Sequence, residues 1–247
     1  MTLKDMTLKD IMWFESCDST MDICHRFSAI TKKELSIGAL SQLKGRGTKN
    51  RTWVSPKGNV FLSFLLHPDP LKVHIIHMLG TLAIYEFLSQ SLHFNNISLK
   101  WPNDVMVQGK KISGVLQENV YQNQDLIYSV LGIGFNVNLD GIQDIDNEYT
   151  SMKIISGKSY KVKNISDDII PYFYDLYYSS MGVSQIVSLW KNKIDTIGKN
   201  VVLEMKDNKR LEGKVIGVNN DGDLLLAKTD KTQLTVKSGL VNKLIVD

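Results

Sequence analysis

The chain has 247 residues, a formal net charge of +3 at pH 7 and a hydrophobic content of 43%. This length allows one large domain or one domain with a small module, and the composition is typical of a soluble globular protein. The mild charge requires neither a nucleic acid nor a membrane as partner, and no segment approaches the roughly 18 unbroken apolar residues of a membrane span. The N-terminus lacks the apolar core and cleavage site of a secretory signal, so we expect a cytoplasmic protein.

The first part of the chain alternates between strand and helix patterns. In chain order we predict a strand at 11–16, a helix over about 20–33, a strand at 37–43, a loop over 44–59, a buried strand at 60–66 and a helix over 71–93. Asp18, Ser19 and Thr20 are N-cap candidates for the first helix. The loop contains only two large apolar side chains, Trp53 and Val54, which are too few for a regular amphipathic element.

The middle of the chain continues with strands and then turns helical. Here we predict a strand at 97–105, a hairpin over 106–118, a strand at 126–139, a polar stretch over 144–157 and helices over 167–181 and 183–194. The first of these strands ends at Trp101, because Pro102 excludes the helical region for the residue before it. Gln108 and Gly109 are the predicted turn of the hairpin.

The pattern changes again at about residue 196, where strand-length runs are separated by turn residues. Five short strands within about 50 residues are typical of a small β-barrel. We therefore expect an α+β fold. A catalytic domain with a mixed sheet and helices packed on it would span residues 1–195, and a C-terminal β-module would span residues 196–247.

The segment from Gly45 to Arg51 (GRGTKNR) combines three cations with two glycines. Glycines let the backbone approach an anion, and backbone N–H groups together with Arg and Lys can surround a phosphate. The Walker A pattern GxxxxGK[ST] is absent. The alternative is a solvated surface loop, and composition alone slightly favours that alternative.

Two further segments carry polar residues at predicted strand ends. In KWPND, Asn103 and Asp104 would lie at a sheet rim, where Asp104 could orient a cation or help to hold magnesium; the alternative is an Asx turn. In KKISGV, strand alternation would place Lys111, Ser113 and Val115 on one face. An inward lysine beside Gly114 could reach an anionic ligand, and the glycine would leave room for a flat one; the alternative is an exposed hairpin lysine.

Three motifs follow one another in the chain: GRGTKNRTWVSPKGNVFLS, KWPNDVMVQGKKISGVLQE and GIGFNVN. The last alone is a weak signal, but the ordered series resembles the biotin–protein ligase family from about residue 13 to the C-terminus. The resemblance implies a catalytic domain of the class II synthetase and biotin–lipoate ligase type, with an SH3-like C-terminal barrel. It also implies that ATP and Mg²⁺ activate biotin as biotinyl-5′-AMP, and that biotin is then joined to a lysine of a biotin carboxyl carrier domain, such as that of acetyl-CoA carboxylase.

The resemblance also implies roles for particular residues. The residues implied to bind biotin are Ser19, Thr20, Gln42, Gly45, Arg46, Lys111 and Gly114. The residues implied to bind ATP are Arg46, Lys49, Arg51, Trp53, Asn103, Asp104 and Asn136. Lys111, Arg46 and Asp104 are the expected catalytic residues, and Asp104 is the expected magnesium ligand.

The chain departs from the family pattern at three positions. Thr48 and Asn50 stand where the family often has an arginine and a glycine, so this loop carries less charge, and Met21 stands where the family has an asparagine. Too few residues precede Trp13 for a helix-turn-helix domain, so we expect no DNA binding. Both a monomer and a homodimer fit the family.

Two other functions are alternatives. A lipoate–protein ligase or octanoyltransferase would share the catalytic fold, but the motif series resembles the biotin branch better. A non-catalytic module could use the basic loop to contact nucleic acid or an acidic partner. The low net charge and the lack of an aromatic-basic stripe argue against that second function.

Overall fold

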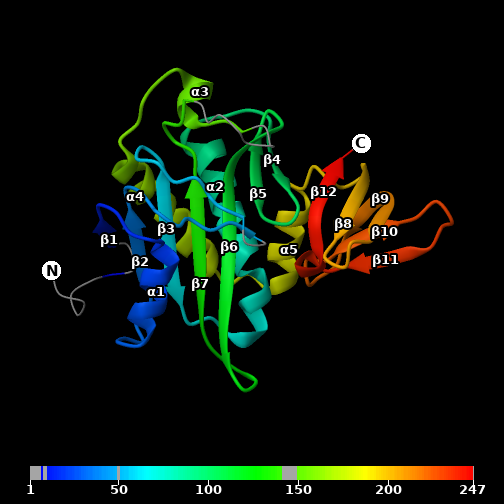
Figure 1. Cartoon of the computed structure of the whole chain (residues 1–247), viewed down its shortest axis with the longest axis horizontal. Coiled ribbons are helices and arrows are strands. Elements are labelled where there is room, and N and C mark those ends of the chain that lie inside the picture. The colour runs from blue at the N-terminus through cyan, green and yellow to red at the C-terminus, as the bar shows by residue number, and fades with distance from the viewer. Residues whose placement is uncertain (1–6, 8–9, 49–50, 141–148, 247) are drawn as a thin grey trace.

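A seven-stranded mixed sheet forms the centre of the molecule, and a five-stranded antiparallel sheet lies beside it (Figure 1). The computed structural model describes residues 7, 10–48, 51–140 and 149–246. Elements of the larger part are β1 (Ile11–Phe14), α1 (Thr20–Ser28), β2 (Leu35–Ala39), β3 (Val60–Leu66), the 3₁₀ turn η2 (Pro70–Ile75), α2 (Ile76–Glu86), the π-helical turn η3 (Phe87–Ser91), β4 (Ile97–Lys100), β5 (Asp104–Val107), β6 (Lys110–Gln122), β7 (Asp125–Phe135), α3 (Met152–Ser156), α4 (Val162–Tyr177) and α5 (Val183–Lys191).

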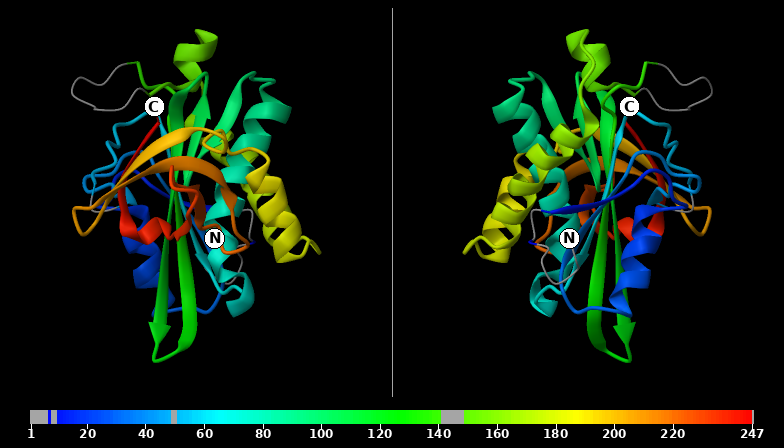
Figure 2. Two further views of the ribbon diagram at one scale, coloured as in Figure 1. Left: turned by 90° about the vertical axis from the view of Figure 1, so that its right-hand side faces the viewer. Right: turned by 90° about the vertical axis from the view of Figure 1, so that its left-hand side faces the viewer.

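The large sheet has the order β1-β2-β3-β7-β6-β5-β4, in which only β1 and β2 run parallel. Different helices pack against the two faces of this sheet, as the side chains of β3 show. Phe64 and Leu66 belong to the main core beneath α2 and α4, whereas Leu65 packs with Ile23 and Cys24 of α1 on the other face. The side views in Figure 2 show α1 and the α4–α5 pair on opposite sides of the strands.

Helix α2 is the central core helix. The continuous helical stretch Pro70–Ser91 is long and apolar enough to cross a membrane by length and composition alone, but 61% of its most apolar window is buried inside the protein. Its side chains Leu79, Leu82 and Ala83 belong to the main core. Packing against the sheet and α4 accounts for its apolar composition.

The C-terminal module consists of β8 (Asn200–Met205), β9 (Arg210–Val218), β10 (Leu224–Ala227), β11 (Gln233–Val236), the 3₁₀ turn η4 (Ser238–Leu240) and β12 (Val241–Val246). Its strands have the order β11-β10-β9-β8-β12 and are all antiparallel. The module shares its core with the larger part, because Leu203 and Val215 belong to the same buried cluster as α2. Trp101 also donates an Nε1 hydrogen bond of 2.9 Å to the Gly222 carbonyl.

The expected α+β architecture with its small SH3-like β-module is confirmed. The described part of the loop over 44–59 contains no α-helix and no extended strand, only an isolated bridge between Arg46 and Thr52 and a 3₁₀ residue at Thr48. The hairpin turns at Gln108 and Gly109, whose φ angles are 53° and 77°. The predicted ends of the helices were less accurate. Helix α1 ends at Ser28, five residues before the predicted end, and is followed by Ala29 as C-cap and by the exposed Ile30. Helix α4 begins at Val162, earlier than predicted, and buries Ile165 in its first turns.

Candidate active site

A cavity of about 750 Å³ lies on the face of the large sheet that α1 covers. The sites predicted from three separate sequence motifs meet here. The predicted residues that line it are Ser19, Thr20, Gln42, Arg46, Arg51, Trp53, Asn103, Asp104, Lys111, Gly114 and Asn136. Gly45 does not line the cavity, because it is buried under Trp53 and Ser55. Lys49 lies outside the described residues, so its role stays a prediction.

One end of the cavity has a connected polar wall at the start of α1. Ser19 caps this helix through Oγ, which accepts a hydrogen bond from the Met21 N–H. Gln42 Oε1 accepts hydrogen bonds from Thr20 N and Oγ1, at 2.9 and 3.1 Å. Ser63 Oγ, which sequence reasoning missed, lies 2.7 Å from Thr20 Oγ1. This wall offers a polar ligand several hydroxyl and amide groups in fixed positions.

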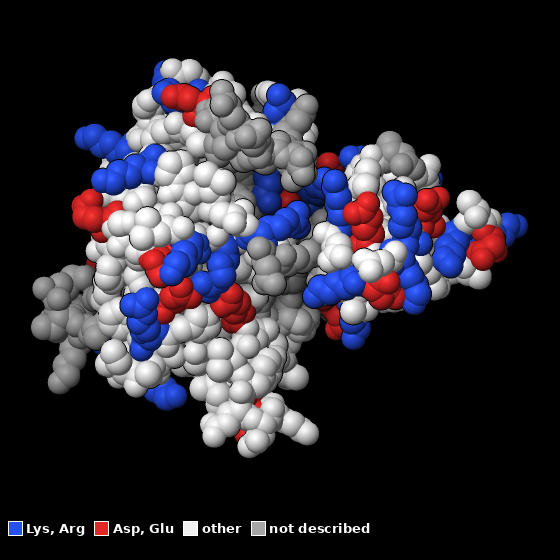
Figure 3. Space-filling model, viewed as in Figure 1, with Lys and Arg blue, Asp and Glu red and all other residues white. Residues whose placement is uncertain are grey.

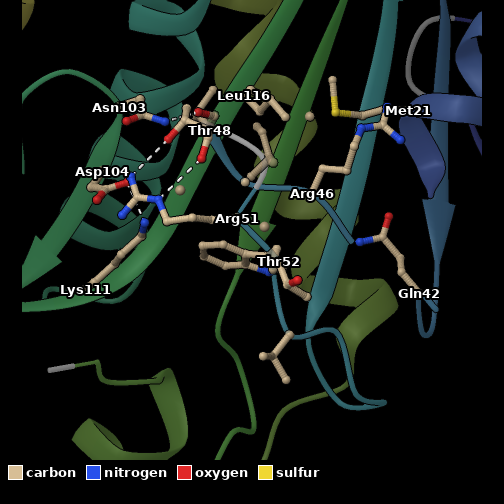
Figure 4. Close-up of a pocket in the computed structure, with 18 of the residues that line it drawn as sticks. Met21, Gln42, Arg46, Thr48, Arg51, Thr52, Asn103, Asp104, Lys111 and Leu116 are labelled. Atoms are coloured by element: carbon tan, nitrogen blue, oxygen red, sulfur yellow. Dashed lines mark hydrogen bonds and ion pairs between the residues drawn. The ribbon is translucent and has the colours of Figure 1, made fainter. Parts of the chain in front are cut away.

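The other end of the cavity contains an ion pair between two strands. Lys111 Nζ lies 2.6 Å from Asp104 Oδ1, and both side chains are about three-quarters buried, with exposures of 27% and 24%. Lys111 Nζ also lies 5.1 Å from the centre of the Trp53 ring. Figure 4 shows Lys111, Asp104 and Arg51 grouped at this end, while Arg46 and Gln42 lie at the opposite end.

A β-bulge determines where Lys111 points. In the ladder between β5 and β6, Val105 pairs with Ser113 and Met106 with Lys111, so Ile112 is an extra residue. The expectation that Lys111 shares a face with Ser113 and Val115 is therefore wrong. Val115 lies in the core on the far face, and Ser113 is buried and donates to the Gly134 carbonyl. Lys111 shares the cavity face with Gly114 instead, since both line the cavity and a Cβ at Gly114 would lie 3.2 Å from Lys111 Nζ.

Two glycines form a flat floor under Trp53. Gly114 on β6 pairs with Gly134 on β7, and side chains there would collide with the indole ring. A Cβ at Gly134 would lie 2.3 Å from Trp53 Cε2, and one at Gly114 would lie 2.9 Å from Trp53 Cζ3. The space predicted for a flat ligand is thus occupied by Trp53 itself in this structure. Trp53 Nε1 is buried and has no hydrogen-bond partner among the described residues.

The two arginines of the glycine loop have different surroundings. Arg46 is paired with Asp22 of α1 at 2.5 Å and with Glu118 of β6 at 3.3 Å. Arg51 instead has its side-chain hydrogen bonds to described residues within its own loop, at 3.4 Å from Nε and Nη2 to Thr48. Of the two, Arg51 is the one that Figure 4 places near Lys111 and Asp104.

Both predicted asparagines use their amides to hold backbone. Asn103 donates to the Val115 carbonyl of β6, and Asn136 donates to the Thr150 carbonyl at 3.1 Å. Asn136 is buried, with an exposure of 7%. Their side chains therefore fix the strand ends that carry Asp104 and the cavity wall.

The C-terminal module contributes residues that sequence reasoning missed. Glu204 on β8 and its cross-strand neighbour Lys243 on β12 line the cavity together with Asn242. Figure 3 shows Lys and Arg side chains gathered at the junction between the two sheets. Nothing in the local pattern of these strands indicates a site, because only the docking of the module brings them to the cavity.

Magnesium can be tested against the residues present. No group of three or more His, Cys, Asp or Glu side chains that could hold a metal exists among the described residues. Mg²⁺ usually keeps several waters and binds through one or two carboxylates plus substrate phosphates. Asp104 supplies one such carboxylate on the cavity wall, so the site fits an ion that arrives with a nucleotide and not one held by protein alone.

Comparisons with known proteins agree with this geometry. Residues 13–136 match the biotin/lipoate A/B protein ligase family, and residues 196–243 match the biotin protein ligase C-terminal domain. The chain belongs to the biotin/lipoate A/B protein ligase family. The match of the C-terminal module places it in the biotin protein ligase branch of that family.

Relatives and solved structures support the same placement. The chain is 28% identical over 225 residues to the bifunctional ligase/repressor BirA of Bacillus subtilis, covering 87% of this chain and 69% of that protein. It is 27% identical to biotin–protein ligase 2 of Arabidopsis thaliana, covering 89% and 70%. The structure of Aquifex aeolicus biotin protein ligase in complex with biotin and ATP matches with a TM-score of 0.80 at 26% identity, covering 97% of this chain and 100% of that chain.

Proposed function

We propose that this biotin protein ligase activates biotin with ATP as biotinyl-5′-AMP and transfers the biotinyl group to a lysine of a biotin carboxyl carrier domain. The Lys111–Asp104 pair carries the proposal, because it lies in a cavity floored by glycines with a polar wall at its other end. Related structures hold biotin and ATP in the Aquifex aeolicus enzyme and biotinyl-5-AMP in the Leishmania major enzyme. A relative from Paracoccus denitrificans is named biotin–[acetyl-CoA-carboxylase] ligase.

In the first step, an oxygen of the biotin carboxylate attacks the α-phosphorus of ATP. The bond from that phosphorus to the pyrophosphate oxygen breaks, and the products are biotinyl-5′-AMP and pyrophosphate. Negative charge accumulates on the phosphate oxygens in the transition state. The Lys111 ammonium and the Arg51 guanidinium stabilise that charge in a partly buried site, where electrostatic interactions are stronger than in water. Asp104 is the residue that would help to hold magnesium, which would supply further neutralisation of the phosphate charge.

In the second step, the ε-amine of the carrier lysine attacks the acyl carbon of the adenylate. The C–O bond to AMP breaks, an amide forms, and the ammonium proton is lost to solvent. No enzyme nucleophile is required. The protein contributes by holding both reactants in one cavity, because orientation alone lowers the barrier by several kcal/mol.

The polar wall is the proposed biotin end. Thr20, Gln42 and Ser19 would bind the polar head of biotin, with the backbone of Arg46 beside them. Gly45, which does not line the cavity, would support this wall from behind. Gly114 would lie under the ligand chain. Trp53 would have to leave the glycine floor, or share it, when the ligand binds.

The remaining roles concern the nucleotide and the chain as a whole. Asn103 and Asn136 would lie by the nucleotide, with their amides hydrogen-bonded to the backbone as described.

We place the division between the catalytic domain and the β-module after residue 195, five residues before β8 begins. The name of the Paracoccus denitrificans relative supports acetyl-CoA carboxylase as the source of the carrier domain, and the fold matches that of the Aquifex aeolicus biotin protein ligase.

The test is incubation of the protein with ATP, magnesium, biotin and a carrier domain, read by intact mass. We expect one biotinyl group per carrier, and no modification when ATP is omitted. Lipoate in place of biotin should give no product. Carrier modified by lipoate and not by biotin would contradict the proposal.

A further inference from the structure

Arg46 is the centre of an ion-pair network that joins the glycine loop to two elements. Its Nη1 atom lies 2.5 Å from Asp22 Oδ1 on α1, and its Nε and Nη2 atoms lie 3.3 Å from the two oxygens of Glu118 on β6. The contact with Glu118 is two-pronged, the arrangement that suits a planar guanidinium best. Three nitrogens of the guanidinium therefore already donate to carboxylates.

The network continues beyond Glu118 to a histidine and a tyrosine. His25 Nε2 lies 2.7 Å from Glu118 Oε2, and its Nδ1 lies 3.1 Å from the Tyr128 hydroxyl. A carboxylate only accepts, so Nε2 carries the proton, and Nδ1 of a neutral ring accepts from the tyrosine. The side-chain exposures of Arg46, Asp22, Glu118 and His25 are 33%, 35%, 33% and 28%. Solvent screens such a pair less than it screens an exposed one.

The Arg46 backbone joins this network to the rest of the loop. Arg46 forms an isolated antiparallel bridge with Thr52, and Trp53 N donates to the Gly45 carbonyl at 2.9 Å. Trp53 in turn covers the glycine floor. Fixing the Arg46 side chain therefore fixes the base of the loop and the position from which Trp53 extends.

We infer that Arg46 is a positioning residue, and that Asp22, Glu118 and His25 hold it so that its own backbone forms part of the biotin end of the cavity. The phosphate-binding arginine is Arg51. The inference rests on the proposed function for its substrates. It departs from the expectation that the Arg46 side chain faces phosphate, because that would require three donors to leave two carboxylates. Arg46 also lies at the opposite end of the cavity from Lys111 and Asp104 (Figure 4).

Separate binding measurements for the two substrates test this inference. The variants are Arg46→Met, Glu118→Gln and Asp22→Asn, with biotin affinity measured by calorimetry and KM for ATP measured from pyrophosphate release. We expect each variant to weaken biotin binding by about three- to tenfold, the range for partly exposed ion pairs, and to change KM for ATP by less than about twofold. Arg51→Met should raise KM for ATP and leave biotin affinity nearly unchanged.

A double variant and a matched control sharpen the test. Arg46→Met combined with Glu118→Gln should bind biotin about as well as Arg46→Met alone, because Arg46→Met already removes the contact with Glu118. Arg46→Lys keeps a cation and should recover part of the affinity. The control is Asp18→Asn, which breaks the exposed Lys44–Asp18 pair at the other side of the loop base and should leave both constants unchanged.

These measurements distinguish a failure of this inference from a failure of the proposed function. A large rise in KM for ATP with Arg46→Met, together with unchanged biotin binding by Glu118→Gln and Asp22→Asn, would overturn the inference and make Arg46 a phosphate ligand. Circular dichroism confirms folding of each variant, and Asp22→Asn serves if Glu118→Gln does not fold. Absence of biotin binding by the unaltered protein would overturn the proposed function itself.

Discussion

Lys111 Nζ lies 2.6 Å from Asp104 Oδ1, across a pair of strands whose register slips by one residue between them. Without the extra residue Ile112, Lys111 would lie on the core face with Val115, where an ammonium group would be unpaired and costly to bury. The bulge therefore gives the cavity its charged end. The bulge also brings Lys111 beside Asp104. This carboxylate neutralises the ammonium group and keeps it in place before any ligand arrives.

Replacement of Lys111 by alanine should nearly abolish adenylate formation. It removes the cation that stabilises charge on the α-phosphate, and losing one such electrostatic contact typically costs about 10²- to 10³-fold in rate. The measurement is biotinyl-AMP formation from labelled ATP in the absence of carrier. Lys110→Ala, on the neighbouring exposed position, is the control and should retain full activity. Retained activity in Lys111→Ala would contradict the assignment.

An alanine at Gly134 should displace Trp53. The added Cβ would lie 2.3 Å from Trp53 Cε2, closer than any real contact, so the indole must leave the glycine floor. We expect a red shift in tryptophan fluorescence, and a weaker biotin affinity because the added methyl group takes up floor space that the ligand would use. Gly239→Ala is the control, since nothing lies within 4 Å of its Cβ. An unchanged emission spectrum in Gly134→Ala would show that the ring is not held on the floor.

The substitution Trp101→Phe should destabilise the protein without altering its chemistry. It leaves the Gly222 carbonyl without its buried hydrogen bond, which typically costs about 1–3 kcal/mol of unfolding free energy. Urea denaturation measures the loss, and activity per folded molecule should stay within about twofold. Equal denaturation midpoints for the two proteins would mean that this bond contributes nothing to the docking of the module.

Glu118 should make stability depend on pH in the acid range. The hydrogen bond from His25, with the charge of Arg46, holds the pKa of Glu118 below its usual value of 4.5, although partial burial opposes this. A lowered folded-state pKa contributes stability above the unfolded pKa, and this stability is lost as pH falls through the folded pKa. From about pH 5 downward, Glu118→Gln should therefore lose less stability than the unaltered protein in urea titrations. Parallel curves would contradict the network.

Much of the fold could be predicted from the sequence, because strands such as 60–66 and the turn at Gln108 and Gly109 carry strong local signals. Helix ends were less predictable, since they depend on what each end packs against. The face of Lys111 was predicted wrongly for a physical reason. A bulge shifts alternation by one residue, and no residue between 110 and 115 signals it locally.

The site was predictable only where one motif carries both the chemistry and the local structure. Asp104 and Lys111 follow from strand ends and a hairpin. Ser63, Glu204 and Lys243 could not be found, because each enters the cavity through tertiary packing alone. The partners of Arg46 belong to the same class, since Asp22 and Glu118 lie 24 and 72 residues away from Arg46 along the chain.

The single buried cluster that runs from α2 into β8 and β9 has a consequence for how the molecule comes apart. Two bodies joined by a linker would melt in two steps, but side chains such as Leu203 and Val215 cannot leave this cluster without opening it for Leu79 and Leu82. The whole chain should therefore unfold as one cooperative unit. A destabilising substitution in the C-terminal strands should then lower the melting temperature of the entire protein, including the strands at the far side of the large sheet.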